Sequence, residues 1–181
     1  LRGNIRVFCR VRPAAGSTGS SLVRVPTGQI EPTTLDLLPP TEANAAGSRA
    51  ASLNPQKFRL DRGFSEGASQ AEVFHEVSQL TQSALDGHRA CIFAYGQTGS
   101  GKTYSMMGVP GDLGLIPRLN NYLFEALEKN KAKNHQYFVT VSYLEIYREK
   151  LQDLLSALPP SKQRIDIRED ALKGVYVDGA E

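Results

Sequence analysis

The sequence predicts an α/β fold, a three-layer sandwich with a mostly parallel central sheet, and three observations carry that prediction. Strand-like segments alternate with helix-like segments, which favours helices packed on a parallel sheet. A glycine-rich loop at residues 96–103 joins an apolar, strand-like run to a helix-forming run. The chain has 181 residues and 40% hydrophobic content, enough for one domain with its own core.

The glycine-rich loop reads GQTGSGKT and matches the pattern G-x-x-x-x-G-K-[ST] at every fixed position. Its glycines allow tight turns that bring backbone N–H groups close to an anion. Lys102 can then reach the β- and γ-phosphates, and the Thr103 hydroxyl can bind Mg²⁺. The alternative is a glycine-rich turn with an incidental Lys-Thr pair, and the flanking strand-like and helix-like runs argue against it. The pattern therefore predicts a P-loop NTPase fold that binds a nucleoside triphosphate.

Composition argues against several other classes of protein. A net charge of +2 is too small to indicate nucleic acid or another polyanionic partner. No apolar run approaches the length of a membrane span, and the N-terminus lacks a signal-peptide pattern, so we expect a cytoplasmic protein without a membrane partner. Cys9 and Cys91 each lie in an apolar run without a neighbouring His or a paired spacing. Buried free thiols are therefore favoured over a disulfide or a catalytic cysteine.

The first predicted strand is residues 4–11, where side chains alternate in character until Pro13 ends the pattern. Residues 14–55 are rich in Ala, Gly, Ser, Thr and Pro, and we expect a weak edge hairpin plus a mobile loop there. Residues 57–60 predict a further strand. The alternating side chains of the first strand are Ile5, Val7, Cys9 and Val11 on one face and Arg6, Phe8 and Arg10 on the other.

A helix is predicted from residue 69 to about residue 86. Ser69 and Glu72 are spaced as a capping box at its start, and Gly87 suits its end. Its apolar face consists of Val73, Phe74, Val77, Leu80, Ala84 and Leu85.

Further elements flank the glycine-rich loop. Residues 90–95 are wholly apolar, as expected of a strand buried on both faces of a parallel sheet. Residues 102–107 contain no Gly or Pro before Gly108 and begin a helix. After a turn at residues 111–114, Pro117 suits the first turn of another helix. The core stripe of that helix is Leu119, Leu123, Phe124 and Leu127.

The last third of the chain predicts three strands and one helix. Residues 137–147 are rich in β-branched and aromatic residues and predict a long strand. Residues 149–155 predict a short amphipathic helix, which the two prolines after Leu158 end. Residues 165–168 and 175–177 predict two strand pieces around a turn at Gly174.

Several of these segments together resemble the motor domain of a kinesin. The run from Ile92 to Tyr104 is similar to the kinesin phosphate loop, and residues 142–155 resemble the family's next signature. Arg10-Val11-Arg12-Pro13 matches its Arg-x-Arg-Pro element, with a weaker match over residues 58–74. Residues 1–7 are similar to the neck–motor junction of C-terminal-motor, minus-end-directed kinesins.

The resemblance covers nearly the whole chain except residues 14–55. It therefore implies that residues 1–181 are the N-terminal part of a kinesin-like motor domain, incomplete at the C-terminus. Within it, residues 14–55 are a loop-rich insertion and residues 90–107 are the P-loop unit.

The resemblance implies a microtubule-based motor ATPase of the cytoplasm and cytoskeleton that uses ATP and Mg²⁺. Arg10, Pro13 and Tyr104 are then expected to border the adenine, since aromatic and guanidinium planes suit a purine. Read from the residues alone, Arg10 is a solvated strand arginine and Pro13 a strand terminator. Lys102 and Thr103 take the catalytic roles, with Thr103 on the Mg²⁺. The implied nucleotide contacts are Arg10, Pro13, Gly96, Gln97, Thr98, Gly99, Ser100, Gly101, Lys102, Thr103 and Tyr104.

The implied track is the microtubule, and the basic residues that follow the predicted long strand are candidates to meet its acidic surface. These residues are Lys150, Lys162, Arg164 and Arg168. Alternatively they form an ordinary solvated face beside Glu149, Asp166 and Glu169. A dimer through a coiled coil N-terminal to Leu1 is the expected assembly of the parent protein.

Neither family switch pattern, Asn-x-x-Ser-Ser-Arg-Ser-His or Asp-Leu-Ala-Gly-Ser-Glu, occurs in the chain. Because phosphoryl transfer depends on positioning and charge stabilisation, residues 1–181 alone are expected to hydrolyse ATP poorly or not at all. Two alternatives stay open at this point. One is a nucleotide-dependent microtubule-binding module without turnover, and the other is a different P-loop enzyme such as a small-molecule kinase or a GTPase.

Overall fold

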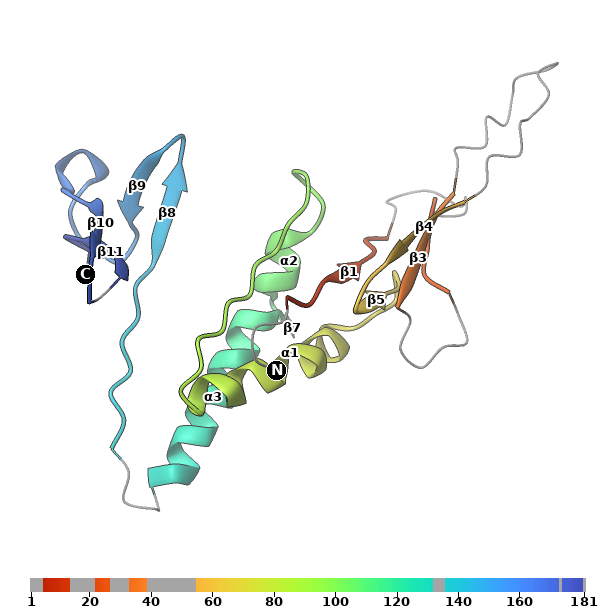
Figure 1. Cartoon of the computed structure of the whole chain (residues 1–181), viewed down its shortest axis with the longest axis horizontal. Helices are drawn as coiled ribbons and strands as arrows, with labels where there is room; N and C mark the ends of the chain where they lie inside the picture. The colour runs from red at the N-terminus through yellow and green to blue at the C-terminus, as the bar shows by residue number, and fades with distance from the viewer. Residues whose placement is uncertain are drawn as a thin grey trace. The chain divides into compact units, whose positions relative to one another are not determined.

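The computed structural model describes residues 5–13, 22–26, 33–38, 55–131, 136–172 and 174–180. The chain divides into two compact units, Leu1–Asn130 and Lys131–Glu181, which are treated separately below (Figure 1). The junction at residues 1–4, on which the predicted direction of travel depends, lies outside the described residues. So does most of the predicted insertion at 14–55.

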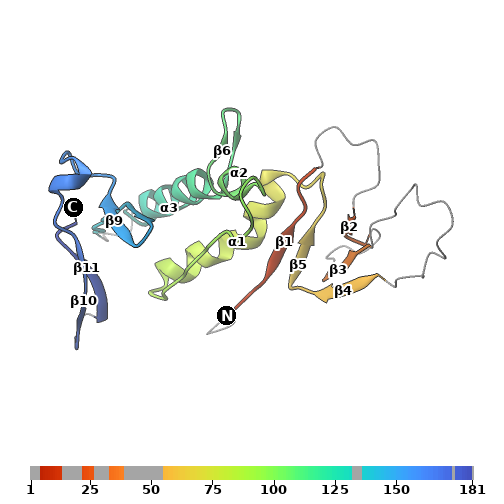
Figure 2. The same ribbon diagram turned by 90° about the horizontal axis from the view of Figure 1, so that it is seen from above.

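The first unit contains one parallel strand pair and a small antiparallel sheet. Strand β1 (Phe8–Arg10) pairs in parallel with β5 (Arg62–Phe64), with Cys9 opposite Gly63. Strands β2 (Val23–Arg24), β3 (Thr34–Leu37) and β4 (Gln56–Arg59) follow one another in an antiparallel sheet. Figure 2 shows β1 and β5 side by side. The predicted strands at 4–11 and 57–60 and the predicted edge hairpin are confirmed, with the first strand shorter than expected.

Helix α1 (Gln70–Leu85) confirms the predicted helix and both of its ends. The Ser69 hydroxyl accepts a hydrogen bond from the backbone N–H of Glu72, and the Glu72 carboxylate accepts one from the Ser69 N–H at 2.7 Å. The Ser69 hydroxyl also donates to this carboxylate at 2.8 Å, and the bonds from the Ser69 N–H and hydroxyl lower the pKa of Glu72 because they stabilise the ionised carboxylate. Gly87 follows the helix with φ +89°, a conformation that favours glycine.

Three short elements and a long helix complete the first unit. Helix α2 (Lys102–Met106) leads into a hairpin of β6 (Gly108–Val109) and β7 (Asp112–Leu113). Helix α3 (Leu115–Lys131) begins immediately afterwards, with Pro117 in its first turn as predicted. Leu127 is buried, but Phe124 is 53% exposed and was wrongly assigned to the core stripe.

Two apolar clusters lie on opposite sides of β1. Phe8 packs against the larger cluster, which contains Phe64 of β5 and Val77 of α1. Cys9 packs against the smaller cluster around Val11, and this burial raises the pKa of its thiol. Because successive strand side chains point to opposite faces, both clusters hold β1 in place. The buried members are Phe64, Val73, Val77 and Leu115 in the first cluster and Val11, Val25 and Leu35 in the second.

In the second unit, the described residues form two β-hairpins and a 3₁₀ turn. Strands β8 (Leu144–Tyr147) and β9 (Lys150–Asp153) pair in antiparallel register. After η1 (Pro160–Lys162), strands β10 (Asp166–Asp170) and β11 (Gly174–Asp178) form the second hairpin and confirm the two predicted strand pieces.

The predicted helix at residues 149–155 is wrong, because this segment contributes β9. Arg148 and Glu149 occupy the left-handed region, with φ of 49° and 63°. Positive φ at both central residues is the signature of a tight two-residue hairpin turn. The turn sends the chain back along β8, with Tyr147 opposite Lys150. Pairing with β8 therefore overrides the local helical pattern.

Two predicted strands lack a partner in the part of the chain that the structure describes. Residues 90–95 form no strand, and Cys91 is exposed rather than buried. Residues 136–143 run as an extended trace before β8, so the predicted strand at 137–147 is confirmed only at its end (Figure 1). A strand needs a neighbour for its backbone N–H and C=O groups. Of the described ladders only β1–β5 is parallel, so the mostly parallel three-layer arrangement stays a prediction.

Exposed aromatic side chains on these two segments predict how residues 1–181 behave when expressed alone. Phe93 is 78% exposed, Tyr95 95% and Phe138 93%. We expect strong binding of the dye ANS, concentration-dependent association and no cooperative thermal transition, because open strand edges and apolar surface are both accessible. Sharp unfolding of a monomer in calorimetry would contradict this expectation.

Candidate functional site

The glycine-rich loop adopts a conformation that depends on its glycines. Gly99 and Gly101 have φ of +79° and +102°, which L side chains rarely adopt. A Cβ on Gly96 would collide with the Ser100 hydroxyl. The Ser100 N–H donates a hydrogen bond to the Gln97 carbonyl at 3.1 Å, which closes the turn. The glycines of the pattern thus permit a tight loop. Side chains at these positions would strain the backbone or collide with neighbouring atoms of the loop.

Lys102 folds back onto the loop that precedes it. Its Nζ donates to the carbonyl oxygens of Gly96 at 2.8 Å and Gln97 at 2.9 Å. An ammonium group has three N–H donors, and these two bonds fix its position relative to the loop backbone. Thr103 is the next residue and is exposed, within the first turn of α2. The loop therefore ends with a lysine and an exposed threonine at consecutive positions.

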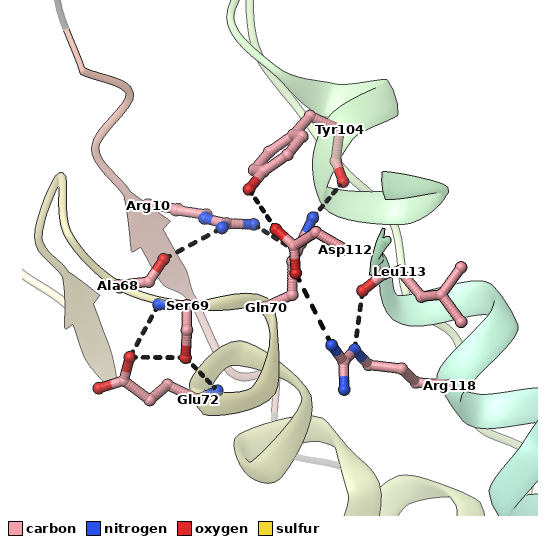
Figure 3. A network of polar contacts seen from close by, with 9 residues as sticks. All are labelled: Arg10, Ala68, Ser69, Gln70, Glu72, Tyr104, Asp112, Leu113 and Arg118. Carbon is pink, nitrogen blue, oxygen red and sulfur yellow. Dashed lines mark hydrogen bonds and ion pairs between the residues drawn. The ribbon is translucent and has the colours of Figure 1, made fainter. Parts of the chain in front are cut away.

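Arg10 lies in the centre of a polar network that joins β1, α1 and α2 (Figure 3). Its guanidinium carbon is 4.8 Å from the centroid of the Tyr104 ring. Its Nη1 donates to Gln70 Oε1 at 2.8 Å and to Ser105 Oγ at 3.1 Å, and its Nη2 donates to the Ala68 carbonyl at 3.2 Å. Arg10 is thus held by protein groups and is not a solvated strand arginine.

The Tyr104 hydroxyl is fixed by a hydrogen bond to a carboxylate of β7. It donates to Asp112 Oδ2 at 2.8 Å, as Figure 3 shows. This bond raises the pKa of Tyr104, because the carboxylate opposes a phenolate charge beside it. Arg118 in turn lies 3.8 Å from Asp112 and donates to the Leu113 carbonyl at 2.7 Å. The network therefore extends from β1 to the first turn of α3.

The structure brings some predicted site residues together and adds others that the sequence reasoning missed. Arg10 and Tyr104 are in contact, whereas Pro13 is exposed three residues after the end of β1. The sequence pattern indicates no role for Gln70 beyond a place at the start of the helix, between Ser69 and Glu72. The sequence signal for this role is the uncharged carboxamide of Gln70 at the first position of the helix. A side chain at that position can form hydrogen bonds to neighbouring elements. Arg12 Nη1 lies 3.6 Å from the point where a Cβ on Gly99 would sit, and so borders the loop.

The four basic residues predicted to meet a partner all belong to the second unit and are exposed. Arg168 on β10 pairs with Asp178 on β11 at 3.1 Å, which offsets its charge. Lys162 ends η1, Lys150 begins β9, and Arg164 follows Gln163. Gln163 holds this region in shape, since its Nε2 donates to the carbonyls of Asp153 at 2.9 Å and Leu158 at 3.0 Å.

In the part of the chain that the structure describes, no helix is long and apolar enough to cross a membrane. No group of three or more His, Cys, Asp or Glu residues there is arranged to hold a metal ion.

Residues 10–181 match the family model described as the kinesin motor domain. The chain belongs to the kinesin motor domain family. It is 49% identical over 160 residues to kinesin-like protein KIN-14C from Arabidopsis thaliana, a match that covers 86% of this chain and 19% of the relative. The chain thus spans about a fifth of that kinesin's length.

Solved kinesin motors have the same fold as this chain. The C-terminal motor domain of Kar3 from Candida glabrata aligns with a TM-score of 0.77 and 35% identity, over 98% of this chain and 55% of that one. The C-terminal motor and motor homology domain of Kar3Vik1, fused to a synthetic heterodimeric coiled coil, aligns with a TM-score of 0.82 and 34% identity. That match covers 99% of this chain and 46% of the other. These likenesses confirm a P-loop kinesin motor fold.

The hydrogen bond between Tyr104 and Asp112 predicts a measurable pKa change. In Asp112→Asn, the pKa of Tyr104 falls toward its ordinary value, because the neighbouring negative charge is removed. NMR titration of the full-length protein labelled at tyrosine Cζ, with the signal assigned through Tyr104→Phe, measures the shift. Asp86→Asn at the end of α1 serves as the control and leaves Tyr104 unchanged. An unaltered Tyr104 titration in Asp112→Asn would refute the assignment.

Proposed function

We propose that this chain is the ATP-binding part of a microtubule-based motor ATPase. One observation carries the proposal. This chain belongs to the kinesin motor domain family and has a complete G-x-x-x-x-G-K-T loop. Two hydrogen bonds hold the lysine of that loop, Lys102, on the loop's own carbonyls. A positive charge is thereby kept where the loop backbone turns, the arrangement suited to a triphosphate.

The phosphate contacts follow from this loop. Lys102 uses two N–H donors on Gly96 and Gln97, and a phosphate oxygen is the natural acceptor for its third. The tight turns at Gly99 and Gly101 allow the backbone N–H groups of the loop, residues 96 to 103, to approach the anion closely. Arg12 adds positive charge beside Gly99.

Thr103 is the residue of this chain that we assign to Mg²⁺, through its exposed hydroxyl. The donor set fits the metal, because Mg²⁺ is usually held by one or two protein oxygens together with phosphate oxygens and water. When bound with ATP, Mg²⁺ neutralises charge that develops on the phosphate oxygens. Lys102 stabilises the same charge from the protein side.

The adenine is proposed to lie against Tyr104 and Arg10, with Pro13 at the border. Tyr104 keeps 39% of its surface exposed, so its ring is accessible to a base. Arg10 contacts that ring and adds a second planar surface that suits a purine. The network in Figure 3 keeps both groups in place before any ligand arrives, which lowers the entropy cost of binding.

The remaining parts of the proposal concern the whole protein. We propose that residues 1–181 form the N-terminal part of a three-layer motor domain with a mostly parallel central sheet, in which residues 90–107 are the P-loop unit and residues 14–55 an insertion. Segments beyond these residues would position the attacking water. A dimer through a coiled coil before Leu1 agrees with the coiled-coil fusion of the Kar3Vik1 motor. We also propose microtubule attachment and a cytoskeletal location in the cytoplasm, which membership of the kinesin motor domain family supports.

Lys102→Ala in the full-length protein is expected to abolish microtubule-stimulated ATP turnover, at least a hundredfold, because the charge facing the phosphates is removed. A coupled phosphate-release assay measures this loss. Lys57→Ala, an exposed lysine on β4, is the matched control and leaves the rate unchanged. Unaltered turnover in Lys102→Ala would disprove the phosphate-loop assignment. Nucleotide binding with no turnover in the wild-type protein would favour a non-cycling microtubule-binding module.

The microtubule surface of this chain is proposed to include Lys150, Lys162, Arg164 and Arg168. Replacing the first three by Ala is expected to weaken microtubule affinity about tenfold, since an exposed charge contributes roughly 0.5 kcal/mol. Co-sedimentation at several salt concentrations tests this, and the triple variant should show a weaker salt dependence. Arg168→Ala should change affinity less, because Asp178 already offsets its charge. If the wild-type protein and the triple variant have equal microtubule affinities and equal salt dependence, these residues form an ordinary solvated face.

A further inference from the structure

We infer that Gln70 is a positioning residue for recognition of the nucleotide base. Through its two hydrogen bonds, it orients Arg10 and the backbone of Tyr104 as one preformed surface for adenine. The inference rests on the proposed function, because it concerns the same nucleotide site.

The burial of Gln70 is the first argument. Gln70 is only 1% exposed, although it occupies the first position of α1, where most polar side chains face water. Burying a carboxamide is costly unless its oxygen and nitrogen are both bonded. Gln70 meets this condition with partners on two other elements, since Oε1 accepts from Arg10 of β1 and Nε2 donates to the carbonyl of Tyr104 in α2.

The chemical identity of the side chain is the second argument. A carboxamide offers an acceptor and a donor on one rigid plane, so it can bridge a guanidinium and a carbonyl at the same time. A glutamate at this position would accept from Arg10 but could not donate to the Tyr104 carbonyl while ionised. An apolar side chain of the same length would leave both partners without this bond. The two bonds of 2.8 Å each therefore use both the acceptor and the donor of the glutamine carboxamide.

Tyr104 is held both at its backbone carbonyl and at its hydroxyl. Gln70 fixes the backbone of Tyr104 from α1, and Asp112 fixes its hydroxyl from β7 (Figure 3). Arg10 lies over the ring and is bonded to Gln70 as well. Loss of Gln70 would leave Arg10 only Ser105 and the Ala68 carbonyl among these partners, and would remove the hydrogen bond to the Tyr104 carbonyl in α2.

The effect of Gln70 is directed at the base and not at the phosphates. The Nζ of Lys102 bonds to the carbonyls of Gly96 and Gln97, and neither is a partner of Gln70. A ligand that carries phosphates without a base therefore tests whether Gln70 positions the base-binding groups or merely supports the fold.

The experiment compares MgATP with magnesium tripolyphosphate by isothermal titration calorimetry on the full-length protein. Gln70→Met is expected to weaken ATP binding about tenfold, since two buried hydrogen bonds are lost, and to change tripolyphosphate binding less than twofold. Gln70→Glu keeps the bond to Arg10 and should give a smaller loss for ATP. Gln82→Met, the same substitution on an exposed residue of α1, is the matched control and should leave both affinities unchanged.

Three results would overturn the inference. These are an equal loss of affinity for both ligands, no loss for either, and an ATP affinity of Gln70→Glu as low as that of Gln70→Met. If Gln70→Met proves unstable in a thermal melt, Gln70→Glu, which matches glutamine in size, decides the question by the same comparison. Failure of the proposed function would be recognised separately, because wild-type protein would then bind neither ligand and Lys102→Ala would change nothing.

Discussion

The guanidinium of Arg10 is the group on which the arrangement of the proposed nucleotide site depends. Strand β1 carries it, and its hydrogen bonds reach Gln70 of α1, Ser105 of α2 and the Ala68 carbonyl before α1. A planar guanidinium with five donors can bond to several acceptors in its plane while its face covers an aromatic ring. Because the two apolar clusters fix β1 from both faces, this charge is presented on a rigid strand. Three elements distant in sequence thus meet around one side chain.

The glycine-rich loop follows a different physical rule from this network. Its shape arises locally, because positive φ at Gly99 and Gly101 and the close contact at Gly96 follow from the lack of side chains. Lys102 then bonds to carbonyls only five and six residues before it. The loop is therefore encoded over eight consecutive residues. The proposed base-binding side of the site instead brings residue 10 to residue 104, and depends on how β1, α1 and α2 pack.

Whether a predicted helix or strand is confirmed also depends on whether it is encoded within one segment or needs a distant partner. Helix α1 agrees with its prediction because the bonds between Ser69 and Glu72 and the apolar positions of Val73 and Val77 all lie within one segment. Residues 149–155 and 90–95 do not agree, since a strand exists only where another strand pairs with it. Pairing with β8 made a strand of the first segment. In the second segment, the described residues supply no such neighbour, and Phe93 and Tyr95 remain exposed.

The sequence by itself determined the glycine-rich loop, the starts of α1, α2 and α3 and the family of this protein, because each depends on residues within single segments of the chain. It also pointed to Arg10 and Tyr104 through resemblance. Only the tertiary structure decided that Gln70 joins them, that Asp112 holds the Tyr104 hydroxyl and that Arg168 is offset by Asp178. The physical reason is that a hydrogen bond depends on distance and direction in space, whereas periodicity and capping depend on spacing along one segment.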